Sequence, residues 1–250
     1  MATKRINEYR GLRQYIVFIL CVAAAIPLAT IGGGIYYEYR KSISEKVKTQ
    51  LTFIVQHHKE SIDRFLSEIS AAMRVITDLE PLQTVRQQAA LQNVFNALQK
   101  EYDYAFEDMG VIDSKGDHLA YVGPYDLHGR NYSTAPWFTE AMEKKIFISD
   151  VFLGFRQVPH FIIAVKSGKG ESAWILRATI SAAKFGRLVE NVRLGRTGEA
   201  FIINKEGVYQ TRSRMGGNVM EKTDPDFIDV APFEGVKLWQ VDRKGLQVLR

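Results

Sequence analysis

The chain has 250 residues, of which 33 are lysine or arginine and 28 are aspartate or glutamate, for a formal net charge of +5. The first 14 residues hold four basic side chains and one acid, so no basic stripe remains elsewhere to indicate nucleic-acid binding. The single cysteine, Cys21, excludes an intramolecular disulfide, and 46% hydrophobic residues suffice for an ordinary core.

Residues 15–37 form an apolar run without a charged side chain. At about 1.5 Å per residue such a helix is about 34 Å long, which is enough to cross a hydrocarbon core of about 30 Å. A cleaved signal peptide has a shorter apolar region, and the alanines at 23–25, which could resemble a cleavage site, lie inside the run. Tyrosines at both ends favour the headgroup region. The sequence therefore predicts a transmembrane helix at 15–37.

Orientation is less clear from charge, because four basic residues and two acids also follow the run between positions 38 and 48. A short basic N-terminus usually stays in the cytoplasm, whereas large domains translocate largely regardless of their charge. We therefore expect residues 1–14 to be a cytoplasmic tail. The chain would pass once through the inner (plasma) membrane of a bacterium, in contact with its lipid, with the bulk in the periplasm.

Beyond the run, apolar side chains recur at spacings of three and four, which is the period of one helical face. The face comprises Val47, Leu51, Ile54, His58, Ile62, Phe65, Ile69, Met73 and Ile76. No glycine or proline interrupts it before Pro81, so a long stalk helix is predicted over 38–80. A helix of this length needs a partner, either its own downstream domain or the same helix of a second chain, and we expect a homodimer.

Residues 82–98 repeat the helical period in a second, shorter helix. The apolar segments 109–112 and 118–122 then flank a polar turn that ends at Gly116, which predicts a hairpin. Another short helix should begin at Pro136, since proline is favoured in the first turn. Further strands are expected at 146–152, 161–166 and 173–180, and a third helix at 181–192.

The hairpin layout recurs at 200–209, where two apolar residues, an asparagine, two polar residues and Gly207 follow one another before the next strand. Such a layout is common in hairpins, so alone it does not establish an internal repeat. In both places, however, it follows a helix and a short linker. The sequence therefore predicts an α+β fold of two related units in tandem, each with an antiparallel sheet, the second incomplete.

The stretch 194–207 (LGRTGEAFIINKEG), which follows a long helix and a sheet that begins with a hairpin, resembles the double Cache sensor domain. In that family two PAS-like subdomains stand on one long helix. Segments typical of the versions attached to bacterial sensor histidine kinases are 129–133 (GRNYS), 136–138 (PWF), 149–156 (SDVFLGFR) and 159–161 (PHF). The resemblance covers about residues 38 to 250 and implies an extracytoplasmic region that binds a small molecule.

By this resemblance, residues 81–190 would be the membrane-distal, ligand-binding subdomain and residues 191–250 a truncated membrane-proximal one. The sequence contains no second apolar run, no phosphoacceptor box and no nucleotide-binding motif. We therefore expect the input region of a two-component sensor, whose histidine kinase output belongs to a longer parent protein. The alternatives are the input of a chemoreceptor or a diguanylate cyclase, and an anchored periplasmic adaptor that binds another protein.

A PAS-like pocket would lie between the sheet and the loop and helix that cover it. Its candidate residues combine aromatic walls with a carboxylate for an amine and with a guanidinium and an imidazole for an acid. They are Tyr121, Tyr125, Arg130, Tyr132, Trp137, Phe138, Asp150, Phe152, Arg156 and His160. Trp137 and Phe138 could equally be core residues, and Asp150 and Arg156 could pair with each other.

Amino-acid-binding members of the family carry a tyrosine, an arginine two residues before a tryptophan, and a downstream aspartate. The outer members of this set match Tyr132, Trp137 and Asp150. Ala135 stands at the position of the arginine, which in the family holds the carboxylate of the ligand. Arg130 or Arg156 could substitute for it, so an amine, an organic acid and an amino acid all stay open as the ligand.

The chain shows no catalytic motif. Residues 168–170 (GKG) lack the spacing of a phosphate-binding loop, and neither a nucleophile elbow nor a His-Glu-x-x-His pair occurs. The five histidines are too scattered for a metal cluster. We therefore expect no catalysis, no cofactor and no metal in this chain.

Overall fold

The computed structural model describes residues 2–190, 199–214, 216–223, 240–243 and 246–249. The chain divides into two compact units, which are considered separately: His57–Gly235, and Met1–Gln56 together with Val236–Arg250. The α+β fold class predicted from the sequence is confirmed, because a long apolar helix leads into an antiparallel five-stranded sheet. The division of the chain into five segments that was drawn from the sequence stays a prediction.

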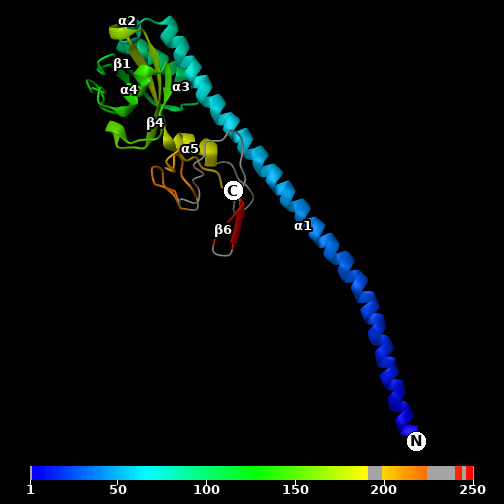
Figure 1. Ribbon diagram of the computed structural model, residues 1–250. Coiled ribbons are helices and arrows are strands. Elements are labelled where there is room, and N and C mark those ends of the chain that lie inside the picture. The colour runs from blue at the N-terminus through cyan, green and yellow to red at the C-terminus, as the bar shows by residue number, and fades with distance from the viewer. Residues whose placement is uncertain (1, 191–198, 215, 224–239, 244–245, 250) are drawn as a thin grey trace. The chain divides into compact units, whose positions relative to one another are not determined.

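Helix α1 (Ala2–Leu79) runs through the N-terminal tail, the apolar run and the predicted stalk without a break (Figure 1). Pro27 lies inside it. Among the described residues, α1 is the one helix that is long and apolar enough to cross a membrane, and the side chains of its apolar part are exposed. Length and composition therefore make α1 a candidate span.

The helical face predicted from the spacing of apolar residues packs against the sheet at the C-terminal end of α1. Ile69 and Met73 are fully buried there, and Ile62, Phe65 and Ile76 lie against the same core. These residues belong to the unit His57–Gly235. This part of the stalk is thus one wall of the core of that unit.

The single helix predicted over 82–98 is two helices, α2 (Leu82–Val85) and α3 (Gln88–Glu101). Val85 and Leu91 are both fully buried. On one continuous helix these two positions would lie about 120° apart, so the break allows both side chains to enter the core. Gln87 adopts an extended conformation at the junction.

The larger sheet has five antiparallel strands in the order β2-β1-β5-β4-β3. A separate two-stranded antiparallel sheet pairs β6 with β7. Helices α4 and α5 and two short 3-10 helices complete the described elements. Their bounds are β1 (Phe106–Asp113), β2 (His118–Val122), α4 (Pro136–Glu143), β3 (Ile146–Ile148), η1 (Gly154–Arg156), β4 (His160–Ser167), η2 (Gly170–Ser172), β5 (Trp174–Ser181), α5 (Ala182–Glu190), β6 (Gln240–Arg243) and β7 (Leu246–Leu249).

The hairpin of β1 and β2, the helix that begins at Pro136 and the strands β4 and β5 confirm the sequence predictions. The strand predicted at 146–152 is shorter and ends at Ile148. The Ser149 hydroxyl accepts a hydrogen bond from the Ile162 N–H at 3.0 Å, so a side chain replaces the next main-chain acceptor of the ladder. The helix predicted at 181–192 is α5, and positions 191 and 192 lie outside the described residues.

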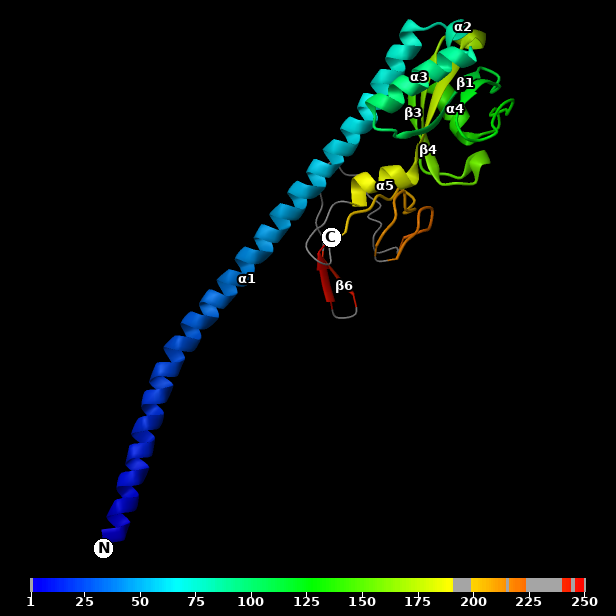
Figure 2. The same cartoon turned by 180° about the vertical axis from the view of Figure 1, so that it is seen from behind.

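Side chains of the five-stranded sheet alternate between its two faces, as the pleat requires. One face, which includes Val111 and Leu176, packs against α1, α3 and α5. The other face, which includes Ile162 and Ile175, packs against α4 (Figure 2). Every residue of β5 except its last is buried, because both faces of this strand are covered.

The turn of the second predicted hairpin has the same hydrogen-bond pattern as the turn of the first. Oδ1 of Asp113 accepts hydrogen bonds from the main-chain N–H groups two and four residues on, and Oδ1 of Asn204 does the same. Gly116 and Gly207 close the two turns with φ of +84° and +73°, a conformation that favours glycine. A β-bridge between Ile203 and Tyr209 flanks the second turn. Residues 194–198 of the recognised motif lie outside the described residues.

Candidate functional site

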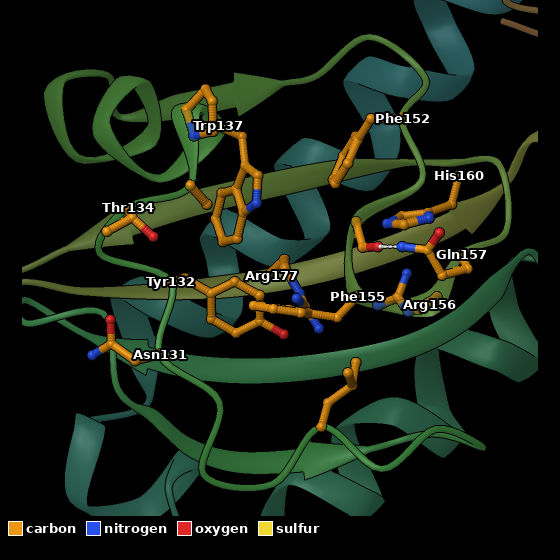
Figure 3. Close-up of a pocket in the computed structure, with 14 residues that line it drawn as sticks. Asn131, Tyr132, Thr134, Trp137, Phe152, Phe155, Arg156, Gln157, His160 and Arg177 are labelled. Atoms are coloured by element: carbon orange, nitrogen blue, oxygen red, sulfur yellow. Dashed lines mark hydrogen bonds between the residues drawn. The ribbon is translucent and has the colours of Figure 1, made fainter.

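A cavity of about 390 Å³ opens on the α4 face of the five-stranded sheet. The segments 131–137 and 152–157 form its walls, and His160 of β4 and Arg177 of β5 contribute from the sheet. Figure 3 shows the side chain of Arg177 next to Tyr132, and that of Arg156 on the side of Gln157 and His160. The cavity therefore combines apolar rings with two cations.

A fully buried carboxylate, Asp108, lies beneath these cations. Asp108 Oδ1 accepts hydrogen bonds from Arg156 Nη2 at 2.6 Å and from Arg177 Nη2 at 3.3 Å. Arg156 Nη2 also donates to the Thr179 hydroxyl at 2.7 Å. The three polar groups of the sheet come from neighbouring strands, since Asp108 is paired with Thr179 and Arg177 with Gly110.

A β-bulge at the start of β1 separates Asp108 from Phe106. The register of β1 against β5 shifts between Phe106 and Asp108. In a regular strand these two residues would share a face, but here Phe106 enters the core against the helices while Asp108 meets Arg156 on the opposite side. Bulges re-aim side chains in this way and are frequent beside functional sites.

The two histidines at the cluster are neutral. The Nδ1–H of His118 donates to the Leu127 carbonyl at 2.8 Å, and the Nδ1–H of His160 donates to the Val158 carbonyl at 2.7 Å. Burial and then the positive charge of Arg177 lower the pKa of His118 to about 3, although its hydrogen bond opposes the shift. Burial, with smaller effects from both arginines, lowers the pKa of His160 to about 4.

The arginines stay charged and exceed the local negative charge. Burial lowers the pKa of Arg156, while Asp108 raises it, and a guanidinium remains protonated in proteins. One carboxylate therefore faces two guanidinium groups. The Arg177 guanidinium lies 5.0 Å from the ring centre of Tyr132 and 6.0 Å from that of Trp137, so aromatic faces cover the charge that Asp108 leaves uncompensated.

Several donors of this cluster have no partner among the described residues. They are Nε and Nη1 of Arg156, Nε of Arg177 and the hydroxyl of Tyr132. Buried polar groups are nearly always hydrogen-bonded in folded proteins. A set of buried cationic donors that lacks protein acceptors, beside a cavity, indicates a site for an acceptor from outside the chain.

The ten candidate residues from the sequence separate into two groups of five. Those that line the cavity are Tyr132, Trp137, Phe152, Arg156 and His160. Those outside its lining are Tyr121, Tyr125, Arg130, Phe138 and Asp150. Their role in binding stays a prediction for both groups.

The second group has identifiable structural contacts. The Tyr121 hydroxyl accepts from the Tyr125 N–H at 3.2 Å, and the ring of Tyr125 lies 5.4 Å from the Arg156 guanidinium. Arg130 lies over the exposed ring of Phe155, and Phe138 packs in the core beneath α4.

Asp150 is exposed and accepts a hydrogen bond from Asn204 Nδ2 at 2.9 Å. Arg156 instead binds Asp108, so the pairing of Asp150 with Arg156 that the sequence left open does not occur.

Sequence reasoning missed Asp108 and Arg177. Arg177 is the single charged residue of β5, a signal that could have revealed it, whereas Asp108 stands beside Glu107 in β1 and carries no such signal. Their partners are remote, since Asp108 precedes Arg156 by 48 residues and Arg177 by 69. The fold alone brings the three side chains together.

Because two histidines are buried, we expect the protein to become less stable as the pH is lowered. Both folded-state pKa values lie below the ordinary value of 6.5, so below pH 6.5 the unfolded chain binds protons that the folded chain does not. The free energy of unfolding should have its full value above about pH 6.5. It should fall by about 1.4 kcal/mol per pH unit for each histidine as the pH drops towards about 4. Urea unfolding of the full chain in nanodiscs at several pH values measures this slope.

His118→Asn should reduce that slope, with His128→Asn as the control because His128 is exposed. An equal slope in the two variants would contradict the assignment of the pH dependence to the buried ring.

Comparison with known proteins identifies the family of this chain. The Cache domain family model matches residues 39–244, and comparison with curated proteins gives no match. The ligand-binding domain of the Pseudomonas fluorescens chemoreceptor CtaA in complex with L-isoleucine shares the fold at 15% identity and a TM-score of 0.61, over 84% of this chain and 86% of that chain. The ligand-binding domain of Mlp24 with asparagine gives 18% identity and 0.59, over 84% and 87%.

The extracellular domain of vpHK1S-Z8, described as a histidine kinase, gives 12% identity and a TM-score of 0.50, over 67% and 68% of the two chains. At these identities the likeness is one of fold. The match to the family model covers most of the chain, and it confirms the resemblance that the sequence motifs predicted. The chain belongs to the Cache domain family.

Proposed function

We propose that this chain is the extracytoplasmic input region of a membrane-anchored receptor, which binds a small molecule in the cavity above β1, β4 and β5. The observation that carries the proposal is the set of buried, unpartnered donors on Arg156 and Arg177 beside a cavity of about 390 Å³. Cavities of roughly 300–1,000 Å³ with apolar walls and a few polar groups are typical of small-molecule sites.

Anchoring is assigned to the apolar part of α1. Residues 15–37 would cross the membrane, with 1–14 in the cytoplasm and the Cache domain in the periplasm. Residues 81–190 would form the ligand-binding subdomain and 191–250 part of the membrane-proximal one. The apolar helix and the Cache match support this placement. Solved relatives by fold include chemoreceptor domains in complex with isoleucine and asparagine, which supports a small metabolite as the ligand.

The signal would leave the cavity through the segment between β3 and β4. Phe152 lines the cavity, and the adjacent Val151 N–H donates to Gln210 Oε1 at 2.6 Å. The second hairpin is thus held to the cavity wall by Gln210 and by the contact of Asn204 with Asp150. Ligand binding would shift the equilibrium between two conformations of this segment. The shift can be no larger than the difference between the ligand's affinities for the two conformations. A homodimeric output in the parent protein, a histidine kinase or a chemoreceptor signalling domain, would respond.

A ligand screen tests the proposal. The full chain in nanodiscs is heated with amines, organic acids and amino acids, each in excess. A true ligand at about a hundred times its dissociation constant should stabilise the chain by about 2.7 kcal/mol, and Trp137→Ala should abolish the shift because Trp137 is a wall of the cavity. Stabilisation by no compound of any class would overturn the proposed function.

A further inference from the structure

The charge balance of the cavity favours one class of ligand over the others that the sequence left open. This inference rests on the proposed function, that the cavity binds a small molecule. The cluster at the base of the cavity contains the buried cations Arg156 and Arg177 and one buried anion, Asp108. His118 and His160 add no charge, because burial disfavours the charged ring and Nε2 of His118 is buried without an acceptor that a second N–H would need. The cluster therefore carries one uncompensated positive charge. A buried charge is costly unless it is paired, so the missing partner is an anion.

The geometry of the arginines suits a carboxylate. Nε and Nη1 of Arg156 and Nε of Arg177 are buried and have no acceptor among the described residues. Each of these N–H groups can donate one charge-assisted hydrogen bond to a carboxylate oxygen, while Nη2 of Arg156 is already bound to Asp108 and Thr179. The hydroxyl of Tyr132, also buried and unpartnered, could donate a further hydrogen bond to the same group.

The cavity offers nothing comparable for an ammonium group. In the described part of the chain, no aspartate or glutamate lines the cavity. Asp108 is occupied by both arginines, and Asp150 lies outside the lining and binds Asn204. The ring faces of Tyr132 and Trp137, which could attract a cation, are already covered by Arg177. The ammonium of an amino acid would meet two guanidinium groups and no counterion.

The walls fit a short apolar body. Trp137, Phe152 and Phe155 line the cavity together with Leu127, while Thr134 and Asn131 supply polar groups at the same site. We infer that the cavity takes a small organic anion, a carboxylate on a short apolar or hydroxylated body without an ammonium group, and that it discriminates against the amino acid of the same shape. This class differs from the amino acids bound by the relatives of similar fold.

Matched pairs of ligands test this inference. Lactate is compared with L-alanine, and leucic acid with L-leucine, because the members of each pair differ in a hydroxyl against an ammonium group; ethylamine represents the amine alone. Calorimetric titration of the full chain in nanodiscs should give at least about a tenfold lower dissociation constant for a hydroxy acid than for its amino acid. Ethylamine should not bind.

Two substitutions connect the preference to the cavity. Arg177→Gln should weaken binding of the hydroxy acid by at least about tenfold. Thr134→Asp places a carboxylate in the lining at an exposed position, where folding is not at risk, and should shift the preference towards the amino acid. Thr139→Asp is the matched control, since Thr139 is exposed on α4 and lies outside the lining.

The outcomes are distinct. Equal or tighter binding of the amino acids, together with a functional cavity, would overturn the inference and leave the proposed function intact. The inference would also be overturned, with the proposed function intact, if Thr134→Asp and Thr139→Asp changed the preference for the hydroxy acid equally. Binding of no member of any pair, in a chain that also fails the wider screen, would overturn the proposed function and the inference with it.

Discussion

Replacement of Asp108 by asparagine should lower the free energy of unfolding by about 3–5 kcal/mol, the cost of breaking a buried ion pair by removal of one partner. The substitution keeps the size of the side chain but leaves Arg156 and Arg177, both nearly fully buried, without a counterion. Urea unfolding of the full chain in nanodiscs, followed by tryptophan fluorescence, measures the loss.

Asp150→Asn is the matched control for this prediction. It makes the same chemical change at an exposed carboxylate, where surface substitutions usually stay within about 0.5 kcal/mol. The Asp108 variant should therefore be distinctly less stable than the Asp150 variant. Equal stabilities would mean that Asp108 does not hold a buried pair of cations, and the charge argument for the ligand would fail with it.

Ile69→Ala should destabilise the Cache domain by about 2–5 kcal/mol, the usual cost of a large cavity in a packed core. Ile69 is fully buried where α1 packs on the sheet. Val75 lies on the same helix with 53% of its surface exposed, so Val75→Ala removes a β-branched side chain without opening a cavity and is the control.

Hydrogen exchange of the β4 and β5 amides, measured in both variants, reports this loss locally. Faster exchange in Ile69→Ala alone is the expected result, because the helix is part of the core that covers these strands. Similar exchange in the two variants would show that the stalk merely carries the domain and does not contribute to its stability.

Local signals in the sequence were enough for the first hairpin and for α4. The polar turn at Asp113 fixes its own geometry through side-chain hydrogen bonds to the following N–H groups, and Pro136 is suited to a first turn. The break between α2 and α3 follows from packing. It lets Val85 and Leu91 enter one core, and no capping or turn residue in the sequence announces it.

The candidate site was predictable in its walls, and in its base only at Arg156. Tyr132, Trp137 and Phe152 were found through resemblance to the family, and they line the cavity. Asp108 escaped because it precedes the apolar segment 109–112 from which the strand was predicted, and because its partners are remote in the chain. Arg177 escaped because its partner lies on another strand. Charged residues within strands that are otherwise apolar deserve a search for a counterion elsewhere in the chain.

The most direct test of this account is a crystal structure of the chain with the tightest-binding hydroxy acid of the paired series. The account predicts carboxylate oxygens within about 3 Å of the guanidinium nitrogens of Arg156 or Arg177, with the body of the acid against Trp137. An acid bound outside this cavity, or bound within it with its carboxylate turned away from both arginines, would contradict the account.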